Sequence, residues 1–395
     1  MPISTLTFQT NALAQMEALE TALSRSQTEL STGKKLLSAA DNPAAMAQVN
    51  ELNAQLSAAQ QHVSNGNAVN SRLQLEQNAL SSATTALQSA RDLAIQANNS
   101  DLSAADRQNI VAQLQQLQQS LLATANSRDA GGSYLFGGTA SGAPPFVTGG
   151  TAVSYRGNDQ VNQVQVGPDH SVSVGDAGSA VFMNLKAGNG TFTTAAGAAN
   201  TGSASIDTGS VTNPAAWVPD TYTISFSSPG QYQVTDSAGT VVAGGAYVDG
   251  QALGFAGVQV TLSGAPAAGD QFTVAPAGSA SVFSTIAGLI TTLSSPALSN
   301  AQIATQVGGA IRQMDTALDH LGTVQAGVGG RLNAISASAA SAQTQQTNIT
   351  TAVSQLRDVD YAAAVTRLSS QELALQAAQE SYASIAKLSL FNYLS

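Results

Sequence analysis

The first 130 residues carry apolar side chains at steps of three and four, the spacing of one face of an α-helix. The first stripe consists of Leu13, Met16, Leu19, Leu23 and Leu30. A polar break at residues 31–35 ends it, and Asn42-Pro43 then places a capping residue before a proline, which favours a new helix start. Later stripes, interrupted at 98–101 and restarted by Ser103 and Asp106, predict long helices of the coiled-coil type.

The pattern changes at about residue 131 to a glycine-rich region in which apolar and polar residues alternate. This alternation is typical of β-strands with one buried face. It is clear at Tyr222, Ile224 and Phe226, which are followed by the turn residues Pro229-Gly230. Residues up to about 280 are therefore predicted to form antiparallel β structure in one or two small subdomains.

Helical spacing returns after residue 281 and continues to the chain end. Because an amphipathic stripe needs a partner, helices from both ends are expected to pack together. The predicted fold is α+β: a long helical coiled-coil or bundle stalk made from both chain ends, with an inserted antiparallel β domain. The predicted domains are an N-terminal assembly helix at 1–40, a helical stalk domain at 41–135 and 281–355, a β-rich domain at 136–280 and a C-terminal assembly helix at 356–395.

The end stripes have no obvious partner inside the chain, so we predict that they form an assembly interface. This interface consists of Leu6, Leu13, Met16, Leu23, Leu30, Val365, Leu368, Leu375, Tyr382, Ile385, Leu388 and Phe391. The alternative is that these residues form the ordinary core of a monomeric bundle. A second group, Tyr134, Phe136, Gly137 and Gly138, is expected to be a turn that plugs the end of the helical domain, since aromatic residues beside glycines more often pack than bind a ligand.

Composition narrows the functional classes. Only 10% of the 395 residues are charged and the net charge is −10, with Lys34-Lys35 as the single basic pair, so nucleic-acid binding is not expected. The absence of cysteine excludes disulfides and thiolate metal sites. Neither a secretory signal peptide nor a run of about 18 apolar residues is present, so no membrane span is predicted.

The sequence gives little indication of a catalytic or metal-binding site. His62, His170 and His320 lack partners at ligand spacing, so no metal site and no cofactor are expected. No G-x-S-x-G motif occurs, and no catalytic residues are predicted. Asp358 and Asp360 are interpreted as helix caps rather than a catalytic pair. Gly329-Gly330 is expected to mark a bend between two helical segments.

Several motifs resemble a known superfamily. Residues 31–44, STGKKLLSAADNPA, are similar to the N-terminal signature of flagellins and their relatives, although Thr32 and Asn42 depart from it. Residues 357–362, RDVDYA, resemble the entry to the last helix of the same superfamily. Within it, the aromatic glycine-rich turn at 131–139 and the ending at 389–394 are similar to the hook-associated protein 3 (FlgL-type) family. Residues 222–276 resemble a module of hook-associated proteins, whereas 187–219 resemble nothing familiar.

The resemblance implies a structural, non-enzymatic subunit that connects the flagellar hook, through hook-associated protein 1, to the flagellin filament. It implies export through the flagellar type III channel, an extracellular place at the hook–filament junction and a ring of copies. It also implies a cytoplasmic chaperone for the C-terminal region, and terminal helices that order only on assembly. The alternative within the class is filament flagellin, and a more distant one is a secreted enzyme acting on glycans, or an adhesin.

Overall fold

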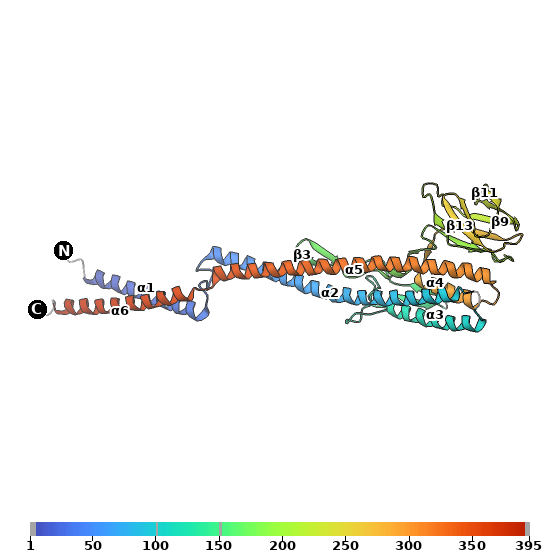
Figure 1. Ribbon diagram of the computed structural model, residues 1–395. Coiled ribbons are helices and arrows are strands. Elements are labelled where there is room, and N and C mark those ends of the chain that lie inside the picture. Colours follow the sequence, from blue (N-terminus) through green and yellow to red (C-terminus); the bar gives the residue numbers. More distant parts are fainter. Residues whose placement is uncertain (1–4, 100–101, 150–151, 392–395) are drawn as a thin grey trace. The chain divides into compact units, whose positions relative to one another are not determined.

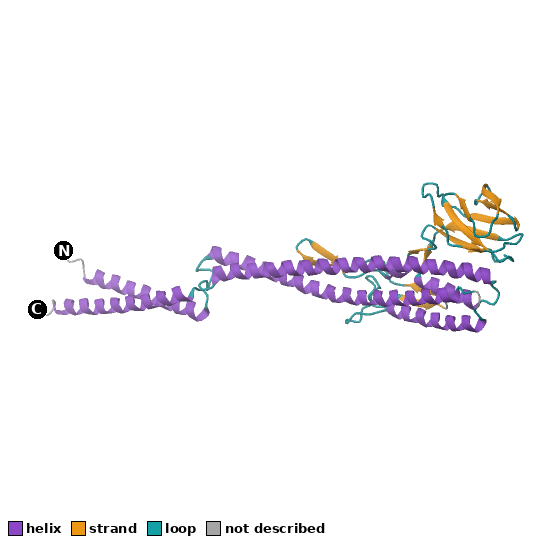
Figure 2. Cartoon of the chain, in the orientation of Figure 1, coloured by secondary structure: helices purple, strands orange, loops and turns teal. Residues whose placement is uncertain are grey.

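The computed structural model describes residues 5–99, 102–149 and 152–391, and the side chains of residues 5, 6, 8 and 385–391 lie outside that description. The helices are α1 (Thr5–Thr32), α2 (Pro43–Ala97), α3 (Ala104–Ala125), α4 (Val282–Ser294), α5 (Asn300–Arg357) and α6 (Tyr361–Phe391), with a π-helical turn η1 (Ser179–Met183) (Figure 1). All strands lie in sequence between α3 and α4 (Figure 2). This confirms the predicted fold class, in which helices from both chain ends flank an inserted antiparallel β region.

Local caps set the helix starts that the sequence predicted. The Asn42 Oδ1 accepts a hydrogen bond from the Ala45 amide at 3.0 Å, and Pro43 is the first residue of α2. Ser103 and Asp106 form a reciprocal capping box at the start of α3. The bend expected at Gly329-Gly330 is wrong, because α5 continues through both glycines. Burial of neighbouring apolar residues of α5 outweighs the helix penalty of about 1 kcal/mol for each glycine.

The chain divides into two compact units. The terminal unit contains residues 1–64 and 338–395, and the central unit contains residues 65–337. Helices α2 and α5 contribute residues to both units.

The central unit has a helical core that also receives the first β segments. The buried helical residues include Leu73, Leu80, Leu87, Leu114, Leu121, Ile286, Met314 and Leu321. Two small hairpins follow, β1 (Phe146–Gly149) with β2 (Ala152–Tyr155) and β3 (Gln163–Gly167) with β4 (His170–Ser173), and the separate strand β5 (Leu185–Lys186) follows η1. The hairpins add Phe146 and Val172 to the same core, and η1 adds Phe182. The residues between 136 and 186, grouped by sequence with the β domain, thus pack with the helices.

One carboxyl group is buried in this helical core. Glu76 of α2 is almost inaccessible to solvent, and its Oε1 accepts a hydrogen bond from the Asp176 amide at 3.0 Å. Asp176 in turn forms an ion pair with Arg331 of α5. Burial and the negative charge of Asp176 raise the pKa of Glu76 from 4.5 to about 8, against the opposing effect of Arg331. The Glu76 side chain is therefore mostly protonated at neutral pH.

The β domain, defined here as residues 187–278, has a core of its own. One antiparallel sheet has the strand order β11-β10-β9-β14-β6, and a second has β12-β13-β7 with β8 also paired to β13. The strands are β6 (Phe192–Ala196), β7 (Ser205–Ile206), β8 (Ser210–Val211), β9 (Tyr222–Ser228), β10 (Gln231–Thr235), β11 (Val241–Ala246), β12 (Ala252–Phe255), β13 (Val258–Ser263) and β14 (Gln271–Pro276). Alternate residues of both sheets, including the predicted Tyr222, Ile224 and Phe226, bury their side chains between them. The unassigned residues 187–219 supply β6, β7 and β8.

A short neck and a few polar contacts connect the β domain to the helices of the central unit. The neck pairs β5 with β15 (Ser279–Ala280) and is extended by a 2.9 Å hydrogen bond from the Ala187 amide to the Gly278 oxygen. Gln302 Nε2 of α5 donates to the main-chain oxygens of Gly197 and Ala198 at 3.3 and 3.2 Å. The two apolar cores are separate clusters among the described residues.

Candidate assembly interface

The two signature segments, which lie at opposite ends of the sequence, meet in the terminal unit. The Gly33 oxygen accepts a hydrogen bond from the Val359 amide at 2.9 Å. The Arg357 oxygen accepts from the amides of Lys35 and Leu36 at 2.8 and 3.3 Å. We call residues 33–36 with 357–359 the joint. The joint is made by backbone atoms, and it links the segment after α1 to the segment before α6.

Gly33 is suited to the joint by its backbone conformation. Its φ is +71°, in the left-handed region that favours glycine. A Cβ at this position would also lie 2.9 Å from the hydroxyl oxygen of Tyr361, closer than such contacts occur. The backbone turn therefore favours glycine here, whereas the Tyr361 hydroxyl is the end of an exposed side chain that can move aside.

The two aspartates before α6 have different roles. Asp360 Oδ1 accepts hydrogen bonds from the amides of Ala362 and Ala363 at 3.0 and 3.2 Å, which confirms the predicted cap. Asp358 does not take the predicted capping role, because its carboxylate forms an ion pair with Arg357 at 3.2 Å. A hydrogen bond from the Ser354 side chain, followed by the charge and hydrogen bond of Arg357, lowers the Asp358 pKa.

A small apolar cluster supports the joint. Leu36 is buried against Val49 of α2 and against Ile349 and Val353 of α5. Leu36 was not among the predicted core residues, because it lies directly after the polar break at residues 31–35 and outside both helical stripes. Its burial anchors the segment between α1 and α2.

Helices α1 and α6 lie side by side and run antiparallel (Figure 1). The half-buried positions on α1 include Ala12, Met16, Leu19, Leu23 and Leu30, and those on α6 are Leu368, Gln371, Leu375, Ala378 and Tyr382. These positions alternate in steps of three and four, the spacing of a two-stranded coiled coil. We call them, together with the buried Ser26 and Ala364, the seam.

The predicted interface residues divide into three groups. Met16, Leu23, Leu30, Leu368, Leu375 and Tyr382 lie on the seam. Leu13 and Val365 turn away from it and are 45% and 48% exposed, and Leu373, which was not predicted, is 69% exposed. The side chains of Leu6, Ile385, Leu388 and Phe391 lie outside the described residues. The pair therefore has exposed apolar side chains on more than one side, and we call Leu13, Val365 and Leu373 together its outer apolar face.

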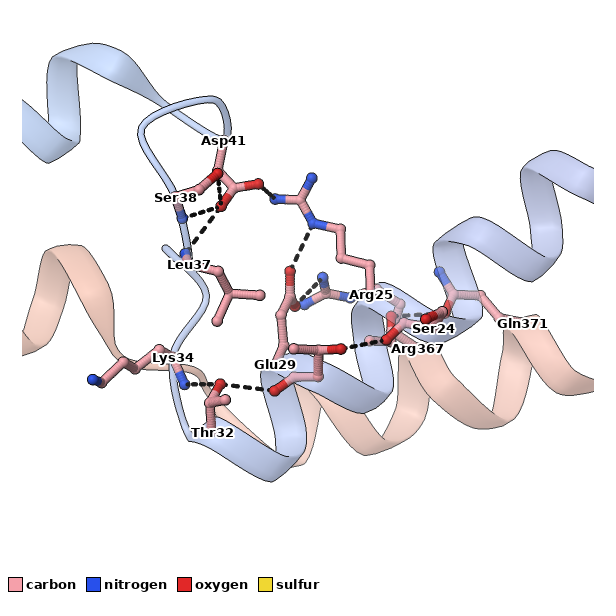
Figure 3. A network of polar contacts seen from close by, with 12 residues as sticks. Ser24, Arg25, Glu29, Thr32, Lys34, Leu37, Ser38, Asp41, Arg367 and Gln371 are labelled. Carbon is pink, nitrogen blue, oxygen red and sulfur yellow. Dashed lines mark hydrogen bonds and ion pairs between the residues drawn. The ribbon is translucent and has the colours of Figure 1, made fainter.

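Two polar residues of α1, Ser26 and Glu29, are nearly as buried as the seam residue Ala364. Glu29 belongs to a network of polar contacts with α6 (Figure 3). Ser26 Oγ donates to Gln371 Oε1 at 2.7 Å. The Glu29 carboxylate, only 4% exposed, accepts from Arg25 at 3.1 Å and from Arg367 at 3.3 Å. We call Ser26, Glu29, Arg367 and Gln371 the polar layer. Sequence reasoning missed it, although Ser26 lies three residues after Leu23 and four before Leu30, at a seam position of the stripe.

Asp41 extends this network to the turn before α2 (Figure 3). Its Oδ1 lies 3.0 Å from Nη2 of Arg25, and its Oδ2 accepts from the amides of Ser38 and Leu37 at 2.7 and 3.0 Å. These two backbone hydrogen bonds are the main reason that the pKa of Asp41 is lowered. The aspartate of the N-terminal signature thus fixes the turn and connects it to α1.

The second predicted group lies in the central unit and is packed. Tyr134, Phe136 and Gly137 are buried, and Gly138 is partly buried. The Phe136 ring meets the Phe182 ring edge to face at a centroid distance of 5.1 Å. Gly138 has a φ of +66°, and a Cβ there would lie 2.1 Å from the Asn158 oxygen. These contacts are those of a structural plug.

The described residues also bear on metal binding and on a membrane span, neither of which the sequence predicted. Within them, no cluster of three or more His, Cys, Asp or Glu side chains is placed to hold a metal ion. His320 Nε2 lies 2.7 Å from the Ala180 oxygen, a main-chain contact. No helix in the described part of the chain has the length and apolar character needed to cross a membrane.

Family models match both ends and the middle of the chain. Residues 3–141 match the bacterial flagellin N-terminal helical region, and residues 305–394 match the bacterial flagellin C-terminal helical region. Residues 195–276 match the D2-like domain of flagellar hook-associated protein 1. The first two matches contain the two halves of the joint.

Individual relatives are similar over different lengths. The flagellar hook-associated protein 3 of Salmonella typhimurium is 31% identical over 159 residues, 40% of this chain and 49% of that protein, so the match spans about half of that relative. The crystal structure of Xanthomonas campestris FlgL is 33% identical, with a TM-score of 0.71, over 76% of this chain and 98% of that one. The flagellar junction protein FlgL from Legionella pneumophila is 33% identical, with a TM-score of 0.71, over 79% and 100%.

Proposed function

The chain belongs to the flagellar hook-associated protein 3 (FlgL) family, and from this we propose that it is a structural subunit of the bacterial flagellum that joins the hook to the filament. The relative from Legionella pneumophila is named a flagellar junction protein. The β domain matches a module of hook-associated protein 1, which favours a hook-associated protein over a filament subunit.

The observation that carries this proposal is the outer apolar face of the α1–α6 pair. Two helices can bury only one side of each other, and Leu13, Val365 and Leu373 stay exposed on the remaining sides. Burying such side chains between neighbouring copies stabilises an assembly by about 25 cal/mol per Å². The ordering of helix residues, at about 1–2 kcal/mol each, offsets much of this gain and would keep free monomers soluble.

The proposed place between hook and filament implies the partners of the chain. They are further copies of the chain in a ring, hook-associated protein 1 on the hook side and flagellin on the filament side. Before export through the flagellar type III channel, a cytoplasmic chaperone holds the C-terminal region. The protein acts by its shape and its surfaces outside the cell, and it catalyses no reaction.

The first test removes residues 1–30 and 361–395. We expect a folded monomer that no longer binds hook ends, measured by sedimentation with isolated hooks that carry hook-associated protein 1. A truncated chain that still binds hooks or forms polymers would contradict the proposal.

A finer test changes only the outer apolar face. The triple variant Leu13→Ser, Val365→Ser and Leu373→Ser leaves the seam residues in place, so we expect normal circular dichroism and loss of hook binding. The matched control is Leu75→Ser on α2, a leucine that is also exposed but lies away from the terminal helices. Equal hook binding by the triple variant and the control would show that this face is not the interface.

Filament flagellin is the second candidate, favoured by the flagellin-type matches at both ends. Copy number distinguishes the two functions, because a junction protein forms a short zone and a flagellin forms the whole filament. Quantitative mass spectrometry of isolated flagella should find this chain at a small fraction of the filament subunit. Comparable abundance would assign it to the filament.

A further inference from the structure

The seam of the α1–α6 pair is unusual in where it places its polar residues. In a two-stranded coiled coil the most buried positions are normally apolar. Here the leucines of the seam are only half-buried, whereas Ser26 and Glu29 are almost fully buried. Each has a partner on α6, namely Gln371 for Ser26 and Arg367 for Glu29.

The apolar residues of α6 do not by themselves select one face. Leu368 and Leu375 lie on the seam, but Val365 and Leu373 lie on other sides of the same helix and are exposed. A rotation of α6 could therefore exchange apolar residues between the seam and the outer face without changing much of the buried apolar area. Some other interaction must therefore favour one rotation of α6 over the others.

We propose that the polar layer, rather than the apolar residues, determines which faces of α1 and α6 meet. Any other rotation would separate Glu29 from Arg367 and leave the buried carboxylate with one cation, Arg25 of its own helix, in place of two. A buried carboxylate that loses one of its two cationic partners is destabilised, so the layer acts mainly by penalising wrong pairings. The Ser26–Gln371 hydrogen bond adds the same restriction one turn away.

The layer also distinguishes one helix from the other. The acidic member, Glu29, is on α1, and the basic member, Arg367, is on α6. Pairing α1 with α1 of another copy would bring two carboxylates together, and pairing α6 with α6 would bring two guanidinium groups together. Such like-charge pairs select against wrong partners. The inference concerns two helices of one chain and stands independently of the proposed place in the flagellum.

The absence of cysteine from the chain allows a direct test in the full-length protein. The in-phase pair is Leu19→Cys with Ala378→Cys, because each position lies one heptad from the polar layer on the seam. The out-of-phase pair is Leu19→Cys with Gln376→Cys, since Gln376 is exposed at nearly the same height on α6. Cross-linking traps a pair even if the helices are ordered for only part of the time. The readout is the ratio of the two intrachain disulfide formation rates, measured by mass spectrometry under mild oxidation.

With the polar layer intact, we expect the in-phase pair to form at least about ten-fold faster. Replacing all four members of the layer by alanine should bring the ratio near one and should produce covalent dimers from pairing between copies. The exchanged variant Ser26→Gln with Gln371→Ser, which keeps a hydrogen-bonding pair and the ion pair, should keep the ratio high. If circular dichroism shows that the four-alanine variant has lost helical structure, the exchanged variant becomes the decisive test.

Two results would overturn the inference. One is an in-phase preference that persists at ten-fold or more in the alanine variant while its helices remain formed. The other is a loss of preference in the exchanged variant, which would show that a polar pair at these positions does not set the pairing.

Discussion

The main-chain oxygen of Gly33 and the amide of Val359 are joined by a 2.9 Å hydrogen bond, so residues near the two ends of the chain meet through backbone atoms. This bond joins the segment after α1 to the segment before α6, and Gly33 has a left-handed backbone conformation there. The stability of the terminal helices should therefore depend on this one glycine.

We expect Gly33→Ala to destabilise the α1–α6 pair by about 1–2 kcal/mol from the left-handed backbone alone. The added Cβ would also meet the hydroxyl of Tyr361, but that exposed side chain can move aside, so the additional loss should be small. Hydrogen exchange would measure this destabilisation. We expect the amides of α1 and α6 to exchange faster in the variant, and to do so together.

Two variants separate these causes. Adding Tyr361→Phe to Gly33→Ala removes the hydroxyl and should recover only the small steric part of the loss. Gly132→Ala is the control for backbone strain, because Gly132 has a φ of +81° and open space around its Cβ position. Recovery of most of the loss in the double variant would show that the contact with Tyr361, rather than the backbone, is the main cause.

Glu76 should make the stability of the central unit depend on pH. Its pKa is higher in the folded chain, about 8, than the usual 4.5, so the folded state binds the proton more tightly. The free energy of unfolding should therefore fall as the pH rises from about 4.5 to 8, by up to about 1.4 kcal/mol per pH unit for one proton. Glu76→Gln keeps a neutral side chain and should remove this slope. Urea unfolding at several pH values would measure it.

The control for this experiment is Glu51→Gln, an exposed glutamate on the same helix. Its pH dependence should match that of the unmodified protein. A Glu76→Gln variant with an unchanged slope would show that Glu76 is ionised in the folded state or that other groups dominate.

Phe136 should contribute more to stability than any exposed leucine. Its side chain is fully buried and contacts Phe182, so Phe136→Ala should lower the free energy of unfolding by about 3–5 kcal/mol. Urea unfolding followed by circular dichroism would measure the loss. Leu75→Ala, at an exposed position, should change it by less than about 0.5 kcal/mol. A Phe136→Ala loss as small as that of Leu75→Ala would show that the turn is not a packing element.

The helix starts were predictable because their causes are local. Asn42-Pro43 and Ser103 with Asp106 are short motifs whose hydrogen bonds lie within one helical turn. The strand of Tyr222 was predictable for a similar reason, since its alternating residues face one core. Which core a strand joins is not local, and the hairpin residue Phe146 packs with the helices rather than with the β domain.

The seam shows where sequence reasoning failed. On α1 it passes through Ala12, so a choice of stripe by side-chain size selects the neighbouring Leu13, which is exposed. The polar layer was missed because Ser26 and Glu29 look like surface residues until Arg367 and Gln371, from the other chain end, are placed beside them. Only the meeting of the two ends gives these four residues a common role.

The neck of the β domain has a consequence for how the protein can vary. The chain enters the domain at Lys186 and leaves it at Ser279, and these two residues are partners in a single short ladder. The domain can therefore be treated as an exchangeable cassette, because any fold whose two ends fit this ladder could replace it without altering the helical core. Natural variation and engineered display of foreign epitopes should both concentrate at this insertion site, while the paired chain ends stay fixed.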